Sequence, residues 1–338
     1  MNILLTGGAG YIGSHACVVL LEAGHDVVVV DNFSNSSPVA LDRVKQITGK
    51  AAVHFPVDIT DGQALRSVFE AHPVDAVIHF AGFKAVGESV EKPLFYYWNN
   101  VVGSVVLLKT MAAFGVRKIV FSSSATVYGA TDRVPTDETC QPAPTNPYGR
   151  TKWMIETILG DLFVSDPSWH ISILRYFNPV GAHESGLIGE DPNGIPNNLV
   201  PYIAQVAIGK QEWLRVWGND YPTPDGTGIR DYIHVMDLVE GHLSALETLF
   251  NRPGCDVYNL GTGKGTSVLE MVAAFEKESG RPIPYRIMAR RPGDVAVSTA
   301  DPTRANRELG WHSHRDVLDM CRDTWRWQKQ NPNGYGQD

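Results

Sequence analysis

The chain has 338 residues, 43% of them hydrophobic, and a formal net charge of −8 at pH 7. This length suits one large α/β domain with an added lobe, or two domains that share a core. The negative charge argues against nucleic-acid partners, and no apolar run approaches the ~20 residues that a membrane span requires. The chain enters a strand at once, which leaves no room for a signal peptide, and its four scattered cysteines lack metal-binding spacing. We therefore expect a cytoplasmic protein with reduced thiols and no metal site.

A glycine-rich turn follows the first predicted strand. Residues 2–5 form an apolar run, the segment TGGAGYIG (6–13) follows directly, and a helical pattern then leads to a second strand that ends at Asp31. Glycines let the backbone approach a pyrophosphate, and the helix N-terminus offers free N–H groups to that anion. Asp31 comes eighteen positions after Gly13, near the ~20 expected for the acid that binds the adenosine ribose. Because a carboxylate there would repel a 2′-phosphate, the segment predicts NAD rather than NADP.

Strand and helix patterns alternate through the first half of the chain. Further strands are predicted over residues 51–57, 76–79, 118–121 and 171–176. This alternation predicts an α/β fold with a doubly wound, Rossmann-type parallel sheet and helices on both of its faces. At two of the strand ends, Asp58 can accept a hydrogen bond from the adenine amino group, and the small residues of 80–84 let the backbone approach the cofactor.

The composition changes after Asn178. Residues 181–228 are rich in Gly, Pro and Asn, with one clear helical pattern near 198–209. Regular patterns resume with a strand, a helix and a strand over 231–235, 236–250 and 257–260. We therefore assign residues 1–177 to an NAD-binding domain, to which 230–260 return. A smaller mixed C-terminal lobe that binds the substrate takes residues 178–229 and 261–338, over the carboxyl edge of the sheet.

A serine cluster and a Tyr–Lys pair form the predicted catalytic set. Serines 122–124 follow the fifth predicted strand, and a predicted helix opens with Tyr148 and Lys152, which share one face because they stand four apart. A free tyrosine has a pKa near ~10 and is a poor base at neutral pH. The ammonium of Lys152 and a positive nicotinamide would stabilise the phenolate and lower the pKa of Tyr148. Lys152 can also donate to the nicotinamide ribose, and Ser124 to the substrate oxygen.

With these motifs the chain resembles the extended short-chain dehydrogenases/reductases, whose two signatures here read TGGAGYIG (6–13) and YGRTK (148–152). More narrowly, it resembles the UDP-galactose 4-epimerases over essentially its whole length. The stretches that carry this closer resemblance are DNFSNSSP (31–38), HFAGFKAVGESVEKPL (79–94), FSSSATVYG (121–129), RYFNPVGAH (175–183), GEDPNGIPNNL (189–199), GNDYPTPDGTGIRDYIHVMDL (218–238) and YNLGTG (258–263).

The resemblance implies an isomerase of galactose metabolism that interconverts UDP-galactose and UDP-glucose without net oxidation. Tyr148 would take the proton of the sugar 4-hydroxyl while C4 passes its hydride to tightly bound NAD. The 4-keto sugar would then rotate and receive the hydride on its other face. By matching position, the residues expected to hold NAD are Gly7, Gly10, Tyr11, Ile12, Gly13, Asp31, Asn32, Asn35, Ser36, Asp58, Ile59, Phe80, Ala81, Gly82, Lys84, Asn99, Ser122, Tyr148, Lys152 and Phe177. The residues expected to meet the UDP-sugar are Ser124, Tyr148, Asn178, Asn198, Leu199, Arg230, Tyr232, Arg291, Asp294 and Ser298.

Two other functions remain as alternatives. A nucleotide-sugar dehydratase or decarboxylase could use the same fold, but relatives that eliminate water carry carboxylates just after the catalytic hydroxyl residue. Those positions are Ala125 and Thr126 here, and neither can act as acid or base in that way. A non-catalytic NAD-binding regulator would have no use for Ser124, Tyr148 and Lys152. Release of bound NAD together with turnover of UDP-galactose would separate the three hypotheses.

The sequence also predicts a homodimer. The predicted helices over 94–114 and 148–163 look apolar on more than one face, which calls for a partner beyond the sheet. The residues that mark these faces are Val102, Val106, Leu107, Trp153, Ile155 and Ile158. Relatives in the extended family pair such helices into a four-helix interface. The alternative is that the C-terminal lobe covers these faces.

Ser298 suggests a wider choice of substrate. In the epimerases that the chain resembles, members confined to UDP-glucose and UDP-galactose tend to carry a bulky aromatic residue at this position. A serine leaves the volume of a phenol ring, enough for the N-acetyl group of UDP-GlcNAc or UDP-GalNAc. We therefore expect dual specificity, unless neighbouring residues collapse into the space.

Overall fold

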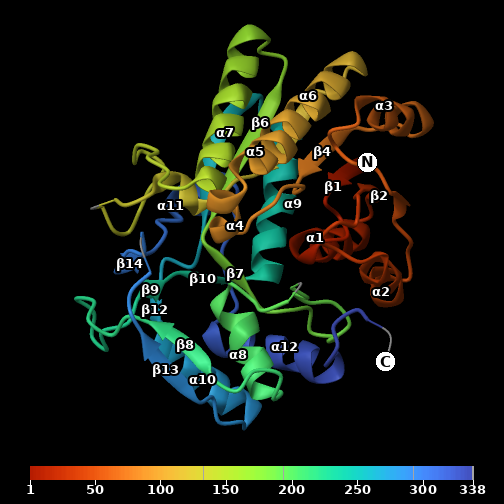
Figure 1. Cartoon of the computed structure of the whole chain (residues 1–338). Helices are drawn as coiled ribbons and strands as arrows, with labels where there is room; N and C mark the ends of the chain where they lie inside the picture. Colours follow the sequence, from red (N-terminus) through yellow and green to blue (C-terminus); the bar gives the residue numbers. More distant parts are fainter. Residues whose placement is uncertain (132, 193, 292, 337–338) are drawn as a thin grey trace.

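The computed structural model describes residues 1–131, 133–192, 194–291 and 293–336, and its centre is a seven-stranded parallel sheet (Figure 1). The strand order is β11-β6-β5-β4-β1-β2-β3. The strands are β1 (Asn2–Thr6), β2 (Asp26–Val30), β3 (Val53–Phe55), β4 (Ala76–His79), β5 (Lys118–Ser122), β6 (His170–Tyr176) and β11 (Gly254–Leu260). This confirms the predicted fold class. The order reverses between β1 and β4, and ligands of such sheets bind at the carboxyl ends of the strands around that point.

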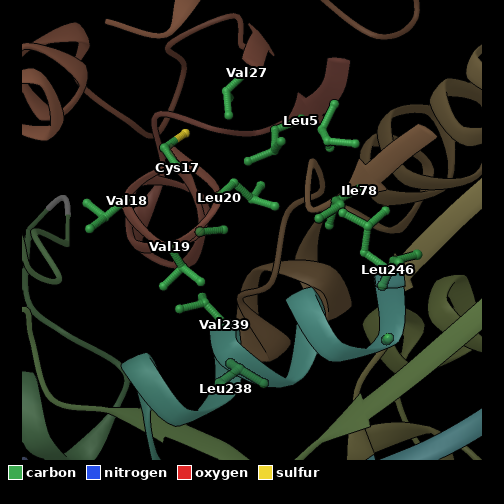
Figure 2. Close-up of a cluster of buried hydrophobic side chains, with 14 of the residues drawn as sticks. Leu5, Cys17, Val18, Val19, Leu20, Val27, Ile78, Leu238, Val239 and Leu246 are labelled. Atoms are coloured by element: carbon green, nitrogen blue, oxygen red, sulfur yellow. The ribbon is translucent and has the colours of Figure 1, made fainter. Parts of the chain in front are cut away.

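Helices cover both faces of the sheet because alternate residues of each strand point to opposite sides. On one face Ile3 and Leu5 pack against α1 (Tyr11–Glu22), α2 (Pro38–Thr48) and α9 (Val235–Asn251). On the other face Leu4 packs with side chains of α3 (Gly62–Ala71), α6 (Gly103–Ala113) and α7 (Pro147–Ser165). Figure 2 shows the first cluster, where side chains of α1 and α9 point toward one another beneath Leu5 and Ile78. Both layers therefore hold the strand ends rigidly.

The segment predicted as one helix over residues 94–114 is interrupted. After α4 (Val86–Glu91), the chain forms α5 (Pro93–Tyr96), then a π-helical segment, η1 (Tyr97–Val102), and only then α6. Asn100 explains the interruption, because its side chain is buried and bonds the backbone N–H and C=O of Phe83 at 2.9 and 3.0 Å. The predicted helix is therefore confirmed apart from this π-helical turn, because the junction residues Tyr97 and Val102 keep right-handed helical dihedrals, and helical periodicity does not distinguish a wider turn.

The second half of the chain adds smaller sheets and a third apolar cluster. Strands pair as β10-β7, β12-β9-β14 and β13-β8, while α8, α10 and α12 surround the third cluster. These elements lie together at the lower end of Figure 1. Their bounds are β7 (Asn178–Val180), α8 (Leu199–Ala207), β8 (Leu214–Trp217), β9 (Ile229–Arg230), β10 (Tyr232–His234), β12 (Thr266–Ser267), α10 (Val268–Ser279), β13 (Tyr285–Met288), β14 (Val297–Ser298), α11 (Thr303–Glu308) and α12 (Val317–Gln330). No helix of the described ranges is long and apolar enough to cross a membrane.

Candidate active site

The glycine turn between β1 and α1 is closely packed. Gly7 has φ +71°, and a Cβ atom there would lie 2.8 Å from the amide nitrogen of Ala81. A Cβ atom at Gly13 would lie 2.2 Å from the carbonyl oxygen of Gly7. Gly10, the N-cap residue of α1, offers no side-chain cap, and the first turn of Tyr11 and Ile12 carries no acid. The turn therefore presents backbone N–H groups to an anion, as the pyrophosphate of a dinucleotide requires.

Asp31 ties the glycine turn to the loop that follows β2. Its Oδ2 accepts from the amide of Ala9 at 3.0 Å, and its Oδ1 accepts from the Phe33 amide at 2.9 Å and the Ser36 hydroxyl at 2.8 Å. The residues predicted to hold the adenosine end of NAD therefore lie on one loop, which carries Asn32, Asn35 and Ser36.

Asp58 lies beside this loop, directly before the buried Ile59. Its carboxylate accepts from the Asn32 side-chain amide at 2.8 Å and from the Thr60 amide at 2.8 Å. Burial raises the pKa of Asp58, but the hydrogen bonds from Thr60 and Asn32 outweigh it and lower the pKa below its usual value. Asp58 therefore stays an ionised acceptor, as the prediction of an adenine contact requires.

The segment after β4 follows the same edge toward the catalytic residues. Gly82 has φ +158°, and a Cβ atom there would lie 3.3 Å from Oδ1 of Asn100. The side chain of Asn99 donates to this same oxygen at 2.9 Å, so the π-helical segment η1 places Asn99 against the 80–84 segment. Phe80 packs on the ring of His242, with ring centroids 4.8 Å apart. The predicted cofactor contacts after β4 are thus fixed by side chains from η1 and α9.

Lys84 links the cofactor edge to the C-terminal lobe. Its ammonium lies 2.8 Å from the carboxylate of Glu190, which also accepts from the Asn198 side-chain amide at 3.2 Å. Nearby, the hydroxyl of Tyr11 donates to the carbonyl of Gly181 at 2.7 Å. Glu190 therefore joins Lys84, predicted to bind NAD, to Asn198, predicted to bind the UDP-sugar.

The predicted catalytic set comes together at the end of β5. Lys152 donates from Nζ to the carbonyl of Ser122 at 2.7 Å, and its ammonium lies 4.9 Å from the centre of the Phe121 ring. Tyr148 lies one turn earlier on α7 and is 7% exposed. Ser124 caps the short 3₁₀ helix η2 (Ala125–Tyr128), and its Oγ lies 2.9 Å from Oγ1 of Thr126. An ammonium has three donors, so Lys152 keeps two for a ribose hydroxyl or the phenol.

Among the protein's own residues, burial is the main influence on the ionisation of Tyr148 and Lys152. Burial raises the pKa of Tyr148, Tyr176 raises it further, and the hydrogen bond with Ser124 only partly opposes this. Burial lowers the pKa of Lys152 to about 8, although the charge of Glu156 raises it. The expected lowering of the Tyr148 pKa depends on the charge of the nicotinamide as well as on Lys152, whose ammonium donates to the Ser122 carbonyl, and it stays a prediction. These residues alone keep the phenol protonated at neutral pH.

Several of the predicted UDP-sugar residues lie on or beside the short strands of the C-terminal lobe. Arg230 and Ser298 are register partners in the parallel strands β9 and β14, so their side chains leave the same face. Burial raises the pKa of Tyr232 to about 12, while the charges of Arg230 and Arg291 oppose the rise. Arg291 pairs with Asp294 at 2.9 Å. Pro292, which follows Arg291, lies outside the described residues.

The remaining predicted residues stand at junctions between the two halves. Phe177 is buried at the carboxyl end of β6, and its amide donates to the carbonyl of Leu260 at 3.2 Å. Asn178 opens β7, where its amide donates to the Asp231 carbonyl at 3.0 Å, while Leu199 is the first residue of α8. These predicted residues therefore lie between the carboxyl ends of the sheet strands and the neighbouring lobe.

Sequence reasoning missed the residues that hold this arrangement. Asp231 is fully buried and accepts from the amides of Thr262, Gly263 and Ala300 at 2.9, 2.9 and 3.1 Å. Glu190 and Asp231 both lie in stretches quoted for the resemblance, which was the available signal. Their roles depend on partners far away in the chain, and sequence spacing cannot show these. In the described ranges no group of three or more His, Cys, Asp or Glu side chains could hold a metal ion.

The fold and this constellation define the class of the extended short-chain dehydrogenases/reductases. A family model described as GDP-mannose 4,6 dehydratase matches residues 4–324. UDP-glucose 4-epimerase from Bacillus subtilis is 61% identical, with 99% of each chain covered. The crystal structure of UDP-glucose-4-epimerase from Stenotrophomonas maltophila, with bound NAD and formylated UDP-arabinopyranose, is 52% identical with a TM-score of 0.97 and covers 98% of this chain and 99% of its own. The enzyme from Bifidobacterium longum, in complex with NAD+ and UDP, is 54% identical with a TM-score of 0.96, covering 99% and 100%.

These likenesses extend over the whole chain and not only over the cofactor half. The chain belongs to the UDP-glucose 4-epimerases within the family that the matched model describes.

Proposed function

We propose that the chain catalyses the NAD-dependent interconversion of UDP-galactose and UDP-glucose. The observation that carries the proposal is that Ser124, Tyr148 and Lys152 lie together at the end of β5, at the edge of the sheet where the glycine turn also ends. The same edge meets the lobe that carries Arg230 and Arg291. A proton-transfer group thus stands between a dinucleotide turn and a diphosphate-binding pair of arginines.

The described residues fit NAD as the cofactor. The uncapped N-terminus of α1 suits a pyrophosphate, and the Asp31 carboxylate, beside Ser36 and Ala9, suits ribose hydroxyls and repels a 2′-phosphate. NAD, when bound, supplies the capacity to take a hydride from C4 of the sugar and return it to the opposite face of the 4-keto sugar. Lys84, Asn99, Ser122 and Lys152 would orient its nicotinamide end.

Tyr148 is the proposed base and acid at the sugar 4-hydroxyl. Its proton has to leave before it can accept one, and a protonated Lys152 favours that ionisation. Ser124 would donate to the same sugar oxygen. Arg230 and Arg291 would bind the diphosphate, because a guanidinium fork meets two phosphate oxygens at once. Tyr232, Asn178, Asn198, Leu199 and Asp294 would complete the UDP-sugar site.

Elimination of water is disfavoured by the structure around Ser124. The two following positions carry the methyl of Ala125 and the hydroxyl of Thr126, which is hydrogen-bonded to Ser124. Neither offers a carboxylate for proton transfer at C5 or C6 of a sugar. The test measures NAD released on denaturation together with turnover of UDP-galactose. Stoichiometric NAD without turnover would favour the non-catalytic NAD-binding regulator. A 4-keto-6-deoxy product would establish a dehydratase.

We also propose a homodimer in which α7 and the α5–η1 segment pair with their copies. Leu107 and Ile155, expected at the interface, are instead buried in the core of the chain itself, and Val106 and Ile158 pack against that core. The support comes from Leu94, Trp98 and Met154, whose side chains are 82%, 61% and 44% exposed. Sedimentation of the wild type and of Trp98→Glu at micromolar concentration tests this proposal. A monomeric wild type would contradict it.

Three finer assignments complete the proposal. We assign residues 1–177 with 230–260 to the NAD-binding unit, which the pairing of β11 with β6 supports. We place the protein in the cytoplasm, since all four of its cysteines are free thiols. We assign it activity on the 2-acetamido UDP-hexoses as well, because Ser298 stands beside Arg230 with a small side chain.

A further inference from the structure

A buried ion pair lies directly behind the catalytic residues. Glu156 on α7 and Arg175 on β6 are each 4% exposed. Nε of Arg175 lies 3.1 Å from both carboxylate oxygens of Glu156, and Nη2 lies 2.5 Å from Oε2. Ser123 also donates to Glu156. Replacing a buried pair by apolar residues is often neutral for stability, so its presence here calls for another explanation.

Glu156 lies on the same face of α7 as the catalytic residues. Tyr148, Lys152 and Glu156 stand four apart on α7 and share one face. The three consecutive serines each meet one of them. The Ser122 carbonyl accepts from Lys152, the Ser123 hydroxyl donates to Glu156, and Ser124 lowers the pKa of Tyr148. A shift of α7 against the end of β5 would break both hydrogen bonds together.

Arg175 connects the Glu156–Arg175 ion pair to the 3₁₀ helix η2, which Ser124 caps. Its guanidinium carbon lies 4.8 Å from the centre of the Tyr128 ring, at the end of η2. The Tyr128 hydroxyl donates to the Asn259 side chain on β11 at 2.7 Å. Glu156 on α7 therefore binds both Ser123, which follows β5, and Arg175 on β6.

Glu156 is also the charge that acts on Lys152. The other titratable groups around the catalytic pair are His79 on β4, Tyr176 on β6, Tyr96 on α5 and, beyond Glu156, Arg175. Burial lowers the pKa of His79 to about 3 and raises the pKa values of Tyr96 and Tyr176, so all three are neutral at working pH. Of the described groups, the carboxylate of Glu156 is the one that favours the ammonium of Lys152.

We propose that Glu156 is a positioning residue of the reaction, which sets the register of Ser122–Ser124 against Tyr148 and Lys152 and keeps Lys152 charged. The inference rests on the proposed roles of Tyr148 and Lys152. It makes Glu156 act through Lys152 and not on the substrate, so its loss changes the pH range of turnover as well as the rate.

Two substitutions separate the charge from the register. Glu156→Gln keeps the length and removes the charge, so the alkaline limb of the kcat profile should move down by about one pH unit. Glu156→Asp keeps the charge, but its shorter side chain cannot reach both Ser123 and Arg175. We therefore expect kcat to fall while the alkaline limb stays near that of the wild type. Tyr128→Phe is the control. It removes the hydrogen bond from Tyr128 to Asn259 without changing a charge, so the alkaline limb of the kcat profile should stay unchanged.

A direct measurement makes the outcome independent of turnover. The NMR titration of the Lys152 ε-methylene in ¹³C-lysine-labelled, NAD-loaded protein should show the same downward shift in Glu156→Gln, with Lys152→Met for assignment. If Glu156→Gln folds poorly, the double variant Glu156→Met with Arg175→Met removes two opposite charges at once, so kcat should fall through the lost register while the Lys152 titration changes little. An unchanged Lys152 titration in Glu156→Gln, or an unchanged kcat in the double variant, would overturn the proposal. Turnover retained in Tyr148→Phe would instead refute the proposed function and leave the Glu156 measurement valid.

Discussion

The edge of the sheet that carries Tyr148 and Lys152 and the proposed sugar-binding lobe are held in different ways. At the edge, Tyr148, Lys152 and Ser122 are 7%, 4% and 1% exposed, and the core of the domain fixes them from behind. In the lobe, the Arg291 side chain is 49% exposed and pairs with Asp294, only three positions further along the chain. The residues at the edge are therefore held in place by the protein itself, whereas Arg230 and Arg291, if they bind the diphosphate as proposed, would exchange local partners for it. Changes at the edge should alter the rate of the chemical step, and changes in the lobe should alter binding.

The largest effect is expected at the edge. Tyr148→Phe keeps the buried ring and removes only the proton acceptor, so kcat should fall by on the order of 10²–10⁴. Bound NAD and the thermal midpoint should stay at wild-type values, because the hydroxyl is not part of the core packing. Steady-state turnover of UDP-galactose and NAD release on denaturation provide the measurements. Turnover close to that of the wild type would show that another group is the base.

A lobe substitution should instead appear in KM. Arg230→Met removes a charge from the proposed diphosphate site, and a hydrogen bond to a charged group contributes roughly 1.5–3 kcal/mol, or about 10–100-fold in affinity. KM for UDP-galactose should rise by about that factor, with a smaller change in kcat. Arg286→Met is the matched control, since Arg286 lies on β13 of the same lobe against the ring of Trp213. A drop in kcat with an unchanged KM would contradict the expected difference between the two regions.

The two regions also differ in how far the sequence predicts them. The glycine turn, Asp31 and the Tyr148–Lys152 pair are local patterns with fixed spacing, so the parallel sheet and the cofactor could be predicted. The π-helical segment η1 could not, because Asn100 bonds Phe83 and Thr151, which are distant in the chain. The burial that raises the pKa of Tyr148 could not be predicted either, because it follows from packing. Resemblance supplied the proposed UDP-sugar residues, of which spacing alone would leave Arg230 and Arg291 as surface arginines.

A smaller and more selective effect is expected at Ser298. Ser298→Tyr places a ring beside Arg230, so turnover of UDP-GlcNAc should fall about tenfold while UDP-glucose is affected less. Ser298→Ala keeps the space open and should retain both activities. A comparison of kcat/KM for the two substrates on the three proteins decides the question. If the wild type shows no turnover of UDP-GlcNAc, the space beside Ser298 is closed and the dual specificity is wrong.

The smallest effect concerns the acid stability of the rigid edge. Burial lowers the pKa of His242, which packs on Phe80, to about 4, and that of His15 and His79 to about 3. Each pKa lies below the ~6.5 of an unfolded chain, so the unfolded state binds more protons. The stability from each neutral histidine is therefore complete above pH ~6.5 and is lost as the pH falls toward the folded-state value.

His242→Phe removes one of these groups while keeping a ring beside Phe80 and Tyr176. The free energy of unfolding of NAD-loaded protein should then fall less steeply between pH 6.5 and 4 than in the wild type, whatever the offset at pH 7. Urea unfolding at several pH values gives the two slopes. His312→Phe changes an exposed histidine and should leave the slope unchanged. Parallel curves for the wild type and His242→Phe would mean that His242 does not resist protonation in the fold, and the acid sensitivity would then have to come from His15 and His79 beside the glycine turn and β4.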